Sequence, residues 1–117
     1  MKSLEIIPLE GIPEISPGDD LVQIIGQSGA VLSQDILVVT QKIVSKAENQ
    51  IVEVDPNDPL SHKPLVEEES VRILRRRGDL IISETKHGFV CANAGIDLSN
   101  VQRGQAALLP EDSDRSA

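Results

Sequence analysis

A chain of 117 residues is long enough for one domain, whose core must be aliphatic because Phe89 is its only Phe, Tyr or Trp residue. The net charge of −8 argues against nucleic acid and anionic membranes as partners, and a single aromatic side chain argues against base stacking. The single cysteine excludes an internal disulfide, and with no signal peptide or membrane-length apolar run evident, we expect a cytoplasmic protein.

The first part of the chain predicts a short helix between two strands. Residues 4–9 have the composition of a short strand. Residues 16–20 provide a helix start, and apolar residues at i, i+3 and i+4 within 21–25 predict a helix that Gly26 and Gly29 end. The apolar run within residues 35–40 predicts a strand buried on both faces.

The middle of the chain predicts a half-exposed strand and a second helix. Residues 51–54 alternate apolar and acidic side chains, as a half-exposed strand does, and residues 55–64 form a proline-rich loop. Pro64 then occupies a favoured first helical position, acidic residues follow it, and three arginines precede Gly78. This charge order predicts a helix from Pro64 to Arg77.

The remaining segments complete a strand-rich pattern. Residues 80–82, 89–91 and 106–109 predict further strands, and residues 110–117 have the composition of a helix start. That last segment is either a disordered tail or a chain cut at a helix start, and we favour the cut. Because strands and helices do not alternate strictly, the expected fold class is α+β, with a mixed, mostly antiparallel sheet and a few helices.

Two lysines with a hydroxyl between them are candidate phosphate ligands. Lys42, Ser45 and Lys46 directly follow the predicted strand at 35–40, and ammonium groups bind phosphate oxygens. The alternative is that they are ordinary solvated lysines, which is the commoner case. A glycine-rich phosphate loop of the common type is absent from the sequence.

The segment from His87 to Asn100 carries the second candidate site. Asp97, Ser99 and Asn100 provide a carboxylate, a hydroxyl and an amide, and a carboxylate can hold Mg²⁺ together with phosphate oxygens. The alternative is a loop in which Asp97 and Asn100 bond their own backbone. Cys91 lies in an apolar run and is interpreted as a core residue rather than a nucleophile.

Four segments together resemble the coenzyme F420-0:L-glutamate ligase family, also called F420 γ-glutamyl ligases. They are residues 8–21, residues 35–48, residues 84–101 and residues 108–112. The resemblance implies an enzyme of F420 biosynthesis that uses GTP and a divalent cation, Mg²⁺ or Mn²⁺ with K⁺ as a further candidate. It would activate the terminal carboxylate of F420-0, through an acyl phosphate, for amide formation with L-glutamate.

The resemblance also assigns roles to residues of this chain, with no catalytic residue among them. The nucleotide-binding positions that it implies are Ile12, Pro13, Glu14, Ile15, Gln41, Lys42, Lys46 and Asn100. Asp97 matches a metal-binding aspartate, and family members are expected to form homodimers.

The match covers the N-terminal part of the family domain, so residues 1–117 are expected to hold a partial site without the C-terminal half. The alternative function is a truncated, non-catalytic homologue that acts as a binding or oligomerisation module. A third reading is an unrelated phosphate-binding enzyme.

Overall fold

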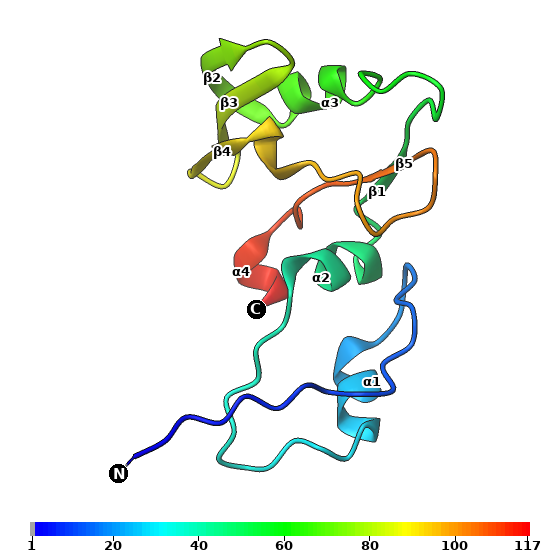
Figure 1. Ribbon diagram of the computed structural model, residues 1–117, viewed down its shortest axis with the longest axis vertical. Helices are drawn as coiled ribbons and strands as arrows, with labels where there is room; N and C mark the ends of the chain where they lie inside the picture. Colours follow the sequence, from blue (N-terminus) through cyan, green and yellow to red (C-terminus); the bar gives the residue numbers. More distant parts are fainter. Residues whose placement is uncertain (1) are drawn as a thin grey trace.

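The computed structural model describes residues 2–117, and Figure 1 shows the arrangement of its elements. In chain order these are α1 (Leu21–Gln27), α2 (Gln41–Ala47), β1 (Ile51–Glu53), α3 (Lys63–Glu68), β2 (Ser70–Arg77), β3 (Leu80–Thr85), β4 (Val90–Ala92), the 3-10 turn η1 (Asn93–Gly95), β5 (Gln105–Ala107) and α4 (Ser113–Ser116). The fold class is α+β, as predicted, and both sheets are antiparallel throughout. No helix among residues 2–117 is long and apolar enough to cross a membrane.

The larger sheet contains three strands in the order β2-β3-β4. Arg77 pairs with Leu80, so a two-residue turn of Gly78 and Asp79 joins β2 to β3. Gly78 has φ 58°, and glycine is the residue that hairpin turns favour at their first central position. Strand β3 then pairs with β4, with Ser83 opposite Cys91.

This hairpin corrects the helix predicted from Pro64 to Arg77. The helix α3 begins at Lys63, with Pro64 in its first turn as expected, but it ends at Glu68. The following residues form β2 because Val71 and Ile73 flank an arginine in the alternation that a strand requires. The arginines and Gly78 belong to the hairpin and its turn, although the same residues also resemble the end of a helix.

The smaller sheet pairs β1 with β5, and it holds Asp97, one of the predicted site residues, beside its edge. Ile51 lies opposite Ala107, which confirms the strands expected in these two regions. The pairing extends beyond β5, because the Leu108 amide donates a hydrogen bond to the Gln50 carbonyl at 2.9 Å. Ala107 also forms an isolated bridge with Asp97, which fixes the backbone of Asp97 beside the sheet.

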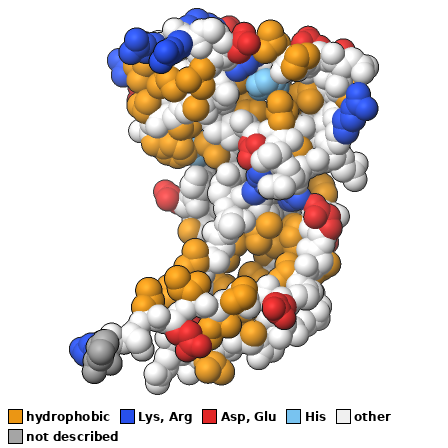
Figure 2. All heavy atoms as spheres, in the orientation of Figure 1, with side chains coloured by type: hydrophobic (Ala, Val, Ile, Leu, Met, Phe, Trp, Pro, Cys, Tyr) orange, Lys and Arg blue, Asp and Glu red, His pale blue; other side chains and the backbone are white. Residues whose placement is uncertain are grey.

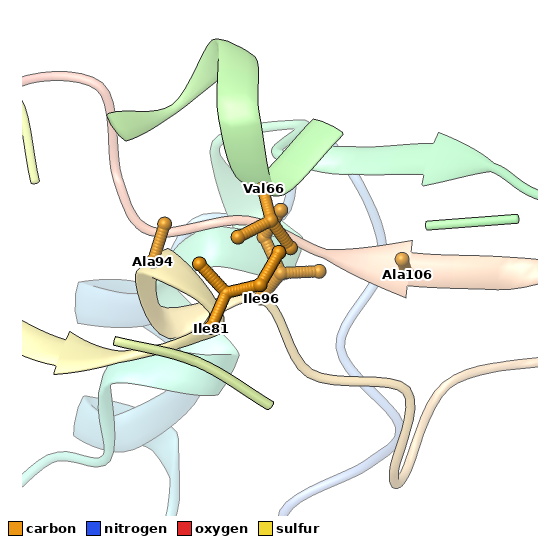
Figure 3. Close-up of a cluster of buried hydrophobic side chains, with 5 residues drawn as sticks. All are labelled: Val66, Ile81, Ala94, Ile96 and Ala106. Carbon is orange, nitrogen blue, oxygen red and sulfur yellow. The ribbon is translucent and has the colours of Figure 1, made fainter. Parts of the chain in front are cut away.

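A small aliphatic core joins the two sheets. Its buried members are Val66, Ile81, Ala94, Ile96 and Ala106. Figure 3 shows the side chains from α3, β3, η1 and the loop after it lying together, with Ala106 of β5 to their right. The prediction of a core built from aliphatic residues is therefore confirmed.

The N-terminal region is open. Helix α1 forms as predicted at its start, where Asp20 accepts a hydrogen bond from the Gln23 amide at 3.0 Å. It continues through Gly26, which was expected to help end it, and Gly29, with φ 68°, follows its end. Residues 4–9 and 35–40, however, belong to no strand in the described chain, so both strand predictions are wrong. Ile36 is 90 % exposed and Val38 is 85 % exposed, the opposite of the expected burial. An apolar run predicts a strand that other parts of the protein would bury, but it does not show that those parts lie within the same chain segment.

The end of the chain forms one helical turn. Asp112 accepts a hydrogen bond from the Arg115 amide at 3.0 Å, as an N-cap residue does, and α4 follows it. The composition of residues 110–117 therefore did indicate a helix start.

Candidate functional site

The candidate site is organised by helix α2. Lys42 and Lys46 are four residues apart on this helix, and residues with that spacing share one helical face. The helix lies between the open N-terminal region and the two sheets (Figure 1). It therefore presents one lysine to each of two loops that are distant in sequence.

Lys42 binds the loop that follows η1. Its ammonium lies 2.5 Å from Oδ2 of Asp97 and donates to the carbonyl and the Oγ of Ser99 at 2.8 and 2.9 Å. An ammonium group has three donors, so these contacts satisfy it completely. Lys42 and Asp97 are 55 residues apart in the sequence, and the structure brings these two predicted site residues together.

Asp97 is held by its backbone and by its side chain. Its amide donates to the Ala107 carbonyl at 3.0 Å and its carbonyl accepts from the Ala107 amide at 2.8 Å. Its Oδ1 accepts from the Ser99 amide at 2.8 Å, which is the turn proposed as the alternative to a metal site. The hydrogen bond from Lys42 is the main cause that lowers the pKa of Asp97 to about 2, and Ser99 lowers this pKa further.

Lys46 binds the loop that precedes α1. Its side chain is only 10 % exposed, and its ammonium pairs with the Glu14 carboxylate, which is largely exposed. Ile15, next to Glu14, is buried, and the Gly18 amide donates to the Ala47 carbonyl at 2.8 Å. The end of α2 therefore anchors the loop of residues 14–18.

Gln41 completes the polar face of α2. Its Nε2 donates to Oγ of the buried Ser45 at 2.5 Å and to the Leu108 carbonyl at 3.4 Å. The contacts of Ser45 with Gln41 and of Ser99 with Lys42 were not predicted from the sequence. The only local signal was the Asp-x-Ser spacing of Asp97 and Ser99, which favours a turn.

Four of the predicted nucleotide-binding residues make no hydrogen bond to Gln41, Lys42 or Lys46 among the described residues, and the buried Ile15 is one of them. Ile12 is half-buried, while Pro13 and Asn100 are exposed. Asn100 has φ 56°, a left-handed conformation that asparagine tolerates in turns. The roles of all four residues stay predictions.

The residues present do not by themselves form a divalent-cation site. No group of three or more His, Cys, Asp or Glu side chains with metal-binding geometry occurs within residues 2–117. Asp97 is the predicted metal ligand, and its Oδ2 already accepts a hydrogen bond from the Lys42 ammonium. Mg²⁺ needs one or two carboxylates together with phosphate oxygens and waters, so further ligands would be required.

The fold and the site define an α+β domain in which two lysines of one helix each pair with a carboxylate from a distant loop. Comparison with known families then places the chain. Residues 11–117 match the model of the F420-0:Gamma-glutamyl ligase family, and the chain belongs to that family.

Curated relatives support the same membership. A protein named coenzyme F420:L-glutamate ligase from Methanothermobacter thermautotrophicus is 41% identical over 133 aligned positions, which cover 97% of this chain and 53% of the relative. Proteins of the same name from Methanopyrus kandleri and Archaeoglobus fulgidus are each 38% identical and cover 97% of this chain. The chain spans about half the length of these relatives, 50% and 51% for the latter two.

Proposed function

We propose that this chain forms the lysine-bearing part of a ligase that adds L-glutamate to coenzyme F420-0 with GTP as the phosphoryl donor. The family and the names of its relatives support glutamate ligation. The observation that carries the nucleotide assignment is the lysine pair of α2, which joins residues 14–18 to residues 97–99.

In this proposal Lys42 and Lys46 exchange their carboxylate partners for phosphate oxygens of GTP. The carboxylates that they now contact show that both ammonium groups suit oxyanions. Lys46 is the better placed of the two, because burial removes the water that would otherwise weaken its interaction with an anion. Gln41 lies at the start of the same helix and would contact the same nucleotide.

The chemistry proceeds in two transfers. The γ-phosphoryl group moves from GTP to the substrate carboxylate, so that one P–O bond breaks, another forms, and GDP is released. The amine of L-glutamate then attacks the acyl phosphate, a C–N bond forms, and inorganic phosphate leaves while the amine loses a proton. Catalysis of phosphoryl transfer depends mainly on positioning and charge stabilisation, which lysines provide.

Asp97 is the residue that the proposal assigns to Mg²⁺ or Mn²⁺. A metal ligand must be ionised, and in the structure the Lys42 hydrogen bond already holds Asp97 in its ionised form by lowering its pKa to about 2. The assignment requires that Lys42 leaves Asp97 and that other ligands come from phosphate groups and from residues outside this chain.

Calorimetric titration of the chain with GTP in the presence of Mn²⁺ tests the proposal. Lys46→Ala is expected to weaken binding at least tenfold, and Asp97→Ala to remove its dependence on Mn²⁺. Lys86→Ala is the matched control, because Lys86 is an exposed lysine that pairs with Glu69 away from α2. Equal affinities for the Lys46 and Lys86 variants would contradict the nucleotide assignment.

A non-catalytic binding module is the second candidate function. It is favoured by the salt bridge in which Lys42 occupies Asp97, the residue that the ligase proposal assigns to the metal. The assay that separates the two functions supplies the rest of a relative's domain, F420-0, L-glutamate, GTP and Mn²⁺. Glutamate addition supports the ligase, whereas assembly without turnover supports the module.

A further inference from the structure

The largest feature that the candidate site does not explain is an exposed apolar surface on the N-terminal region. Ten of the seventeen large hydrophobic side chains exposed within residues 2–117 lie between Leu4 and Val39. They are Leu4, Ile6, Ile7, Val22, Val31, Leu32, Ile36, Leu37, Val38 and Val39. Figure 2 shows hydrophobic side chains gathered along this region, at the bottom of the view. We call these ten residues the N-terminal apolar surface.

The molecule exposes far more area than its mass predicts. A folded monomer of 12.6 kDa exposes about 6,200 Å², whereas this chain exposes 8627 Å². Its radius of gyration is 16.7 Å, against about 13 Å for a compact domain of this length. The excess of about 2,400 Å² on one partner matches the large interfaces of permanent complexes.

The backbone of this region is as open as its side chains. Within the described chain, residues 4–9 and 36–39 form no backbone hydrogen bond with one another or with any other segment. Unpaired amides and carbonyls beside apolar side chains are what an added strand binds.

The side chains show how large a binding partner would be needed to bury this surface. In a strand, Ile36 and Val38 would lie on one face and Leu37 and Val39 on the other, and all four are exposed. A strand that is apolar on both faces belongs inside a sheet with a layer on each side. A short peptide cannot supply neighbouring strands and two covering layers, so the occupant has the size of a domain part.

We infer that the occupant is the rest of the family domain, the half of the curated relatives that this chain does not match. Those relatives are about twice as long as the matched part, so they carry a further segment of comparable size. Residues 4–9 and 36–39 become strands of a sheet completed by that segment. The inference rests on family membership and on the exposed surface, and it is independent of the proposed nucleotide chemistry.

The test measures association and backbone protection rather than catalysis. The full chain is co-expressed with the unmatched half of the Methanothermobacter thermautotrophicus ligase, and also fused to it as one polypeptide. Light scattering is expected to give a one-to-one complex, and hydrogen exchange at residues 36–39 is expected to slow at least a hundredfold in both forms.

Substitutions locate the contact. Val38→Asp is expected to weaken association at least a hundredfold, and Ile6→Asp at least tenfold, while circular dichroism of the isolated chain stays unchanged because both side chains are exposed. Val71→Asp is the matched control, since Val71 is an exposed valine of β2 outside the apolar surface, and it leaves association unchanged.

Two results would overturn the inference. One is fast exchange at residues 36–39 in both the co-expressed and the fused forms. The other is a dimer of the chain alone that protects these residues, because the occupant would then be a second copy. Loss of GTP binding or ligase activity with association intact would count against the proposed function and leave this inference standing.

Discussion

The two regions of this molecule have similarly apolar sequences but opposite degrees of closure. In the sheet region, Ile81 of β3 is 3 % exposed and packs with Val66 and Ile96. In the N-terminal region, Ile36 belongs to an equally apolar run and is exposed. The difference lies in partners: antiparallel hairpins supply their own neighbours within a few residues, whereas an isolated strand depends on a distant segment. Contacts between segments close in sequence therefore bury the apolar residues of the sheet region, whereas those of the N-terminal region stay exposed.

The largest expected effect tests this contrast directly. Ile81→Ala removes buried methylene groups and leaves a cavity, so it should lower the free energy of unfolding by about 2–5 kcal/mol. Ile36→Ala, the same chemical change at an exposed position, should alter it by less than about 0.5 kcal/mol. Urea unfolding of the chain measures both, and similar losses for the two variants would show that the N-terminal region is packed.

Two glycines extend the contrast to the backbone. Gly95 has φ 74°, and a Cβ there would stand 2.8 Å from the side chain of Leu109. Gly95→Ala should cost about 1–2 kcal/mol for the left-handed backbone and a further 1–3 kcal/mol or so for displacing Leu109. Gly29 also has a positive φ, 68°, but open space around it, so Gly29→Ala should cost at most the backbone part. Equal melting temperatures for the two variants would contradict the close packing at Gly95.

The ion pair between Lys42 and Asp97 should have a smaller effect. Asp97 is 45 % exposed at its side chain, so a double-mutant cycle with Lys42→Ala and Asp97→Ala should give a coupling of about 0.5–1 kcal/mol. The more exposed pair of Arg76 and Glu67 is the control and should give less. The lowered pKa of Asp97 makes this stabilisation present above about pH 4, and it is lost as the pH falls towards 2. An undiminished coupling at pH 2 would refute the ion pair.

The smallest expected effect concerns His62, at the start of α3. Burial, with the nearby Lys63, lowers its pKa below 6.5, so the folded protein favours the neutral ring while the unfolded chain takes up a proton more readily. Stability should therefore fall as the pH drops below about 6.5. His62→Leu should flatten this dependence, and His87→Gln is the control that should retain it. Melting temperatures between pH 5 and 7.5 measure the slope, and a slope unchanged by His62→Leu would be the contrary result.

Much of the fold was predictable because it depends on neighbours in sequence. Asp20 before an apolar i, i+3, i+4 pattern predicted α1, and the hairpin of β3 and β4 followed from apolar runs around Gly88. The helix expected up to Arg77 failed because arginines and Gly78 suit both a helix end and a hairpin, and only the pairing with β3 decides between them.

The site was less accessible from sequence. Lys42 and Asp97 are each unremarkable in their own segments, and local patterns favoured a solvated lysine and a turn. Their contact spans 55 residues and follows from the bridge between Asp97 and Ala107, which no local pattern encodes. The resemblance to a family named both residues, whereas the assignment of their roles remains a prediction.

The exposed run at residues 36–39 also has a colloidal consequence. It is apolar and β-prone, which is the composition of segments that aggregate when uncovered. The net charge of −8 keeps copies of the chain apart at neutral pH. That repulsion vanishes near the isoelectric point of about 4.6, so the chain by itself should precipitate most readily at about that pH.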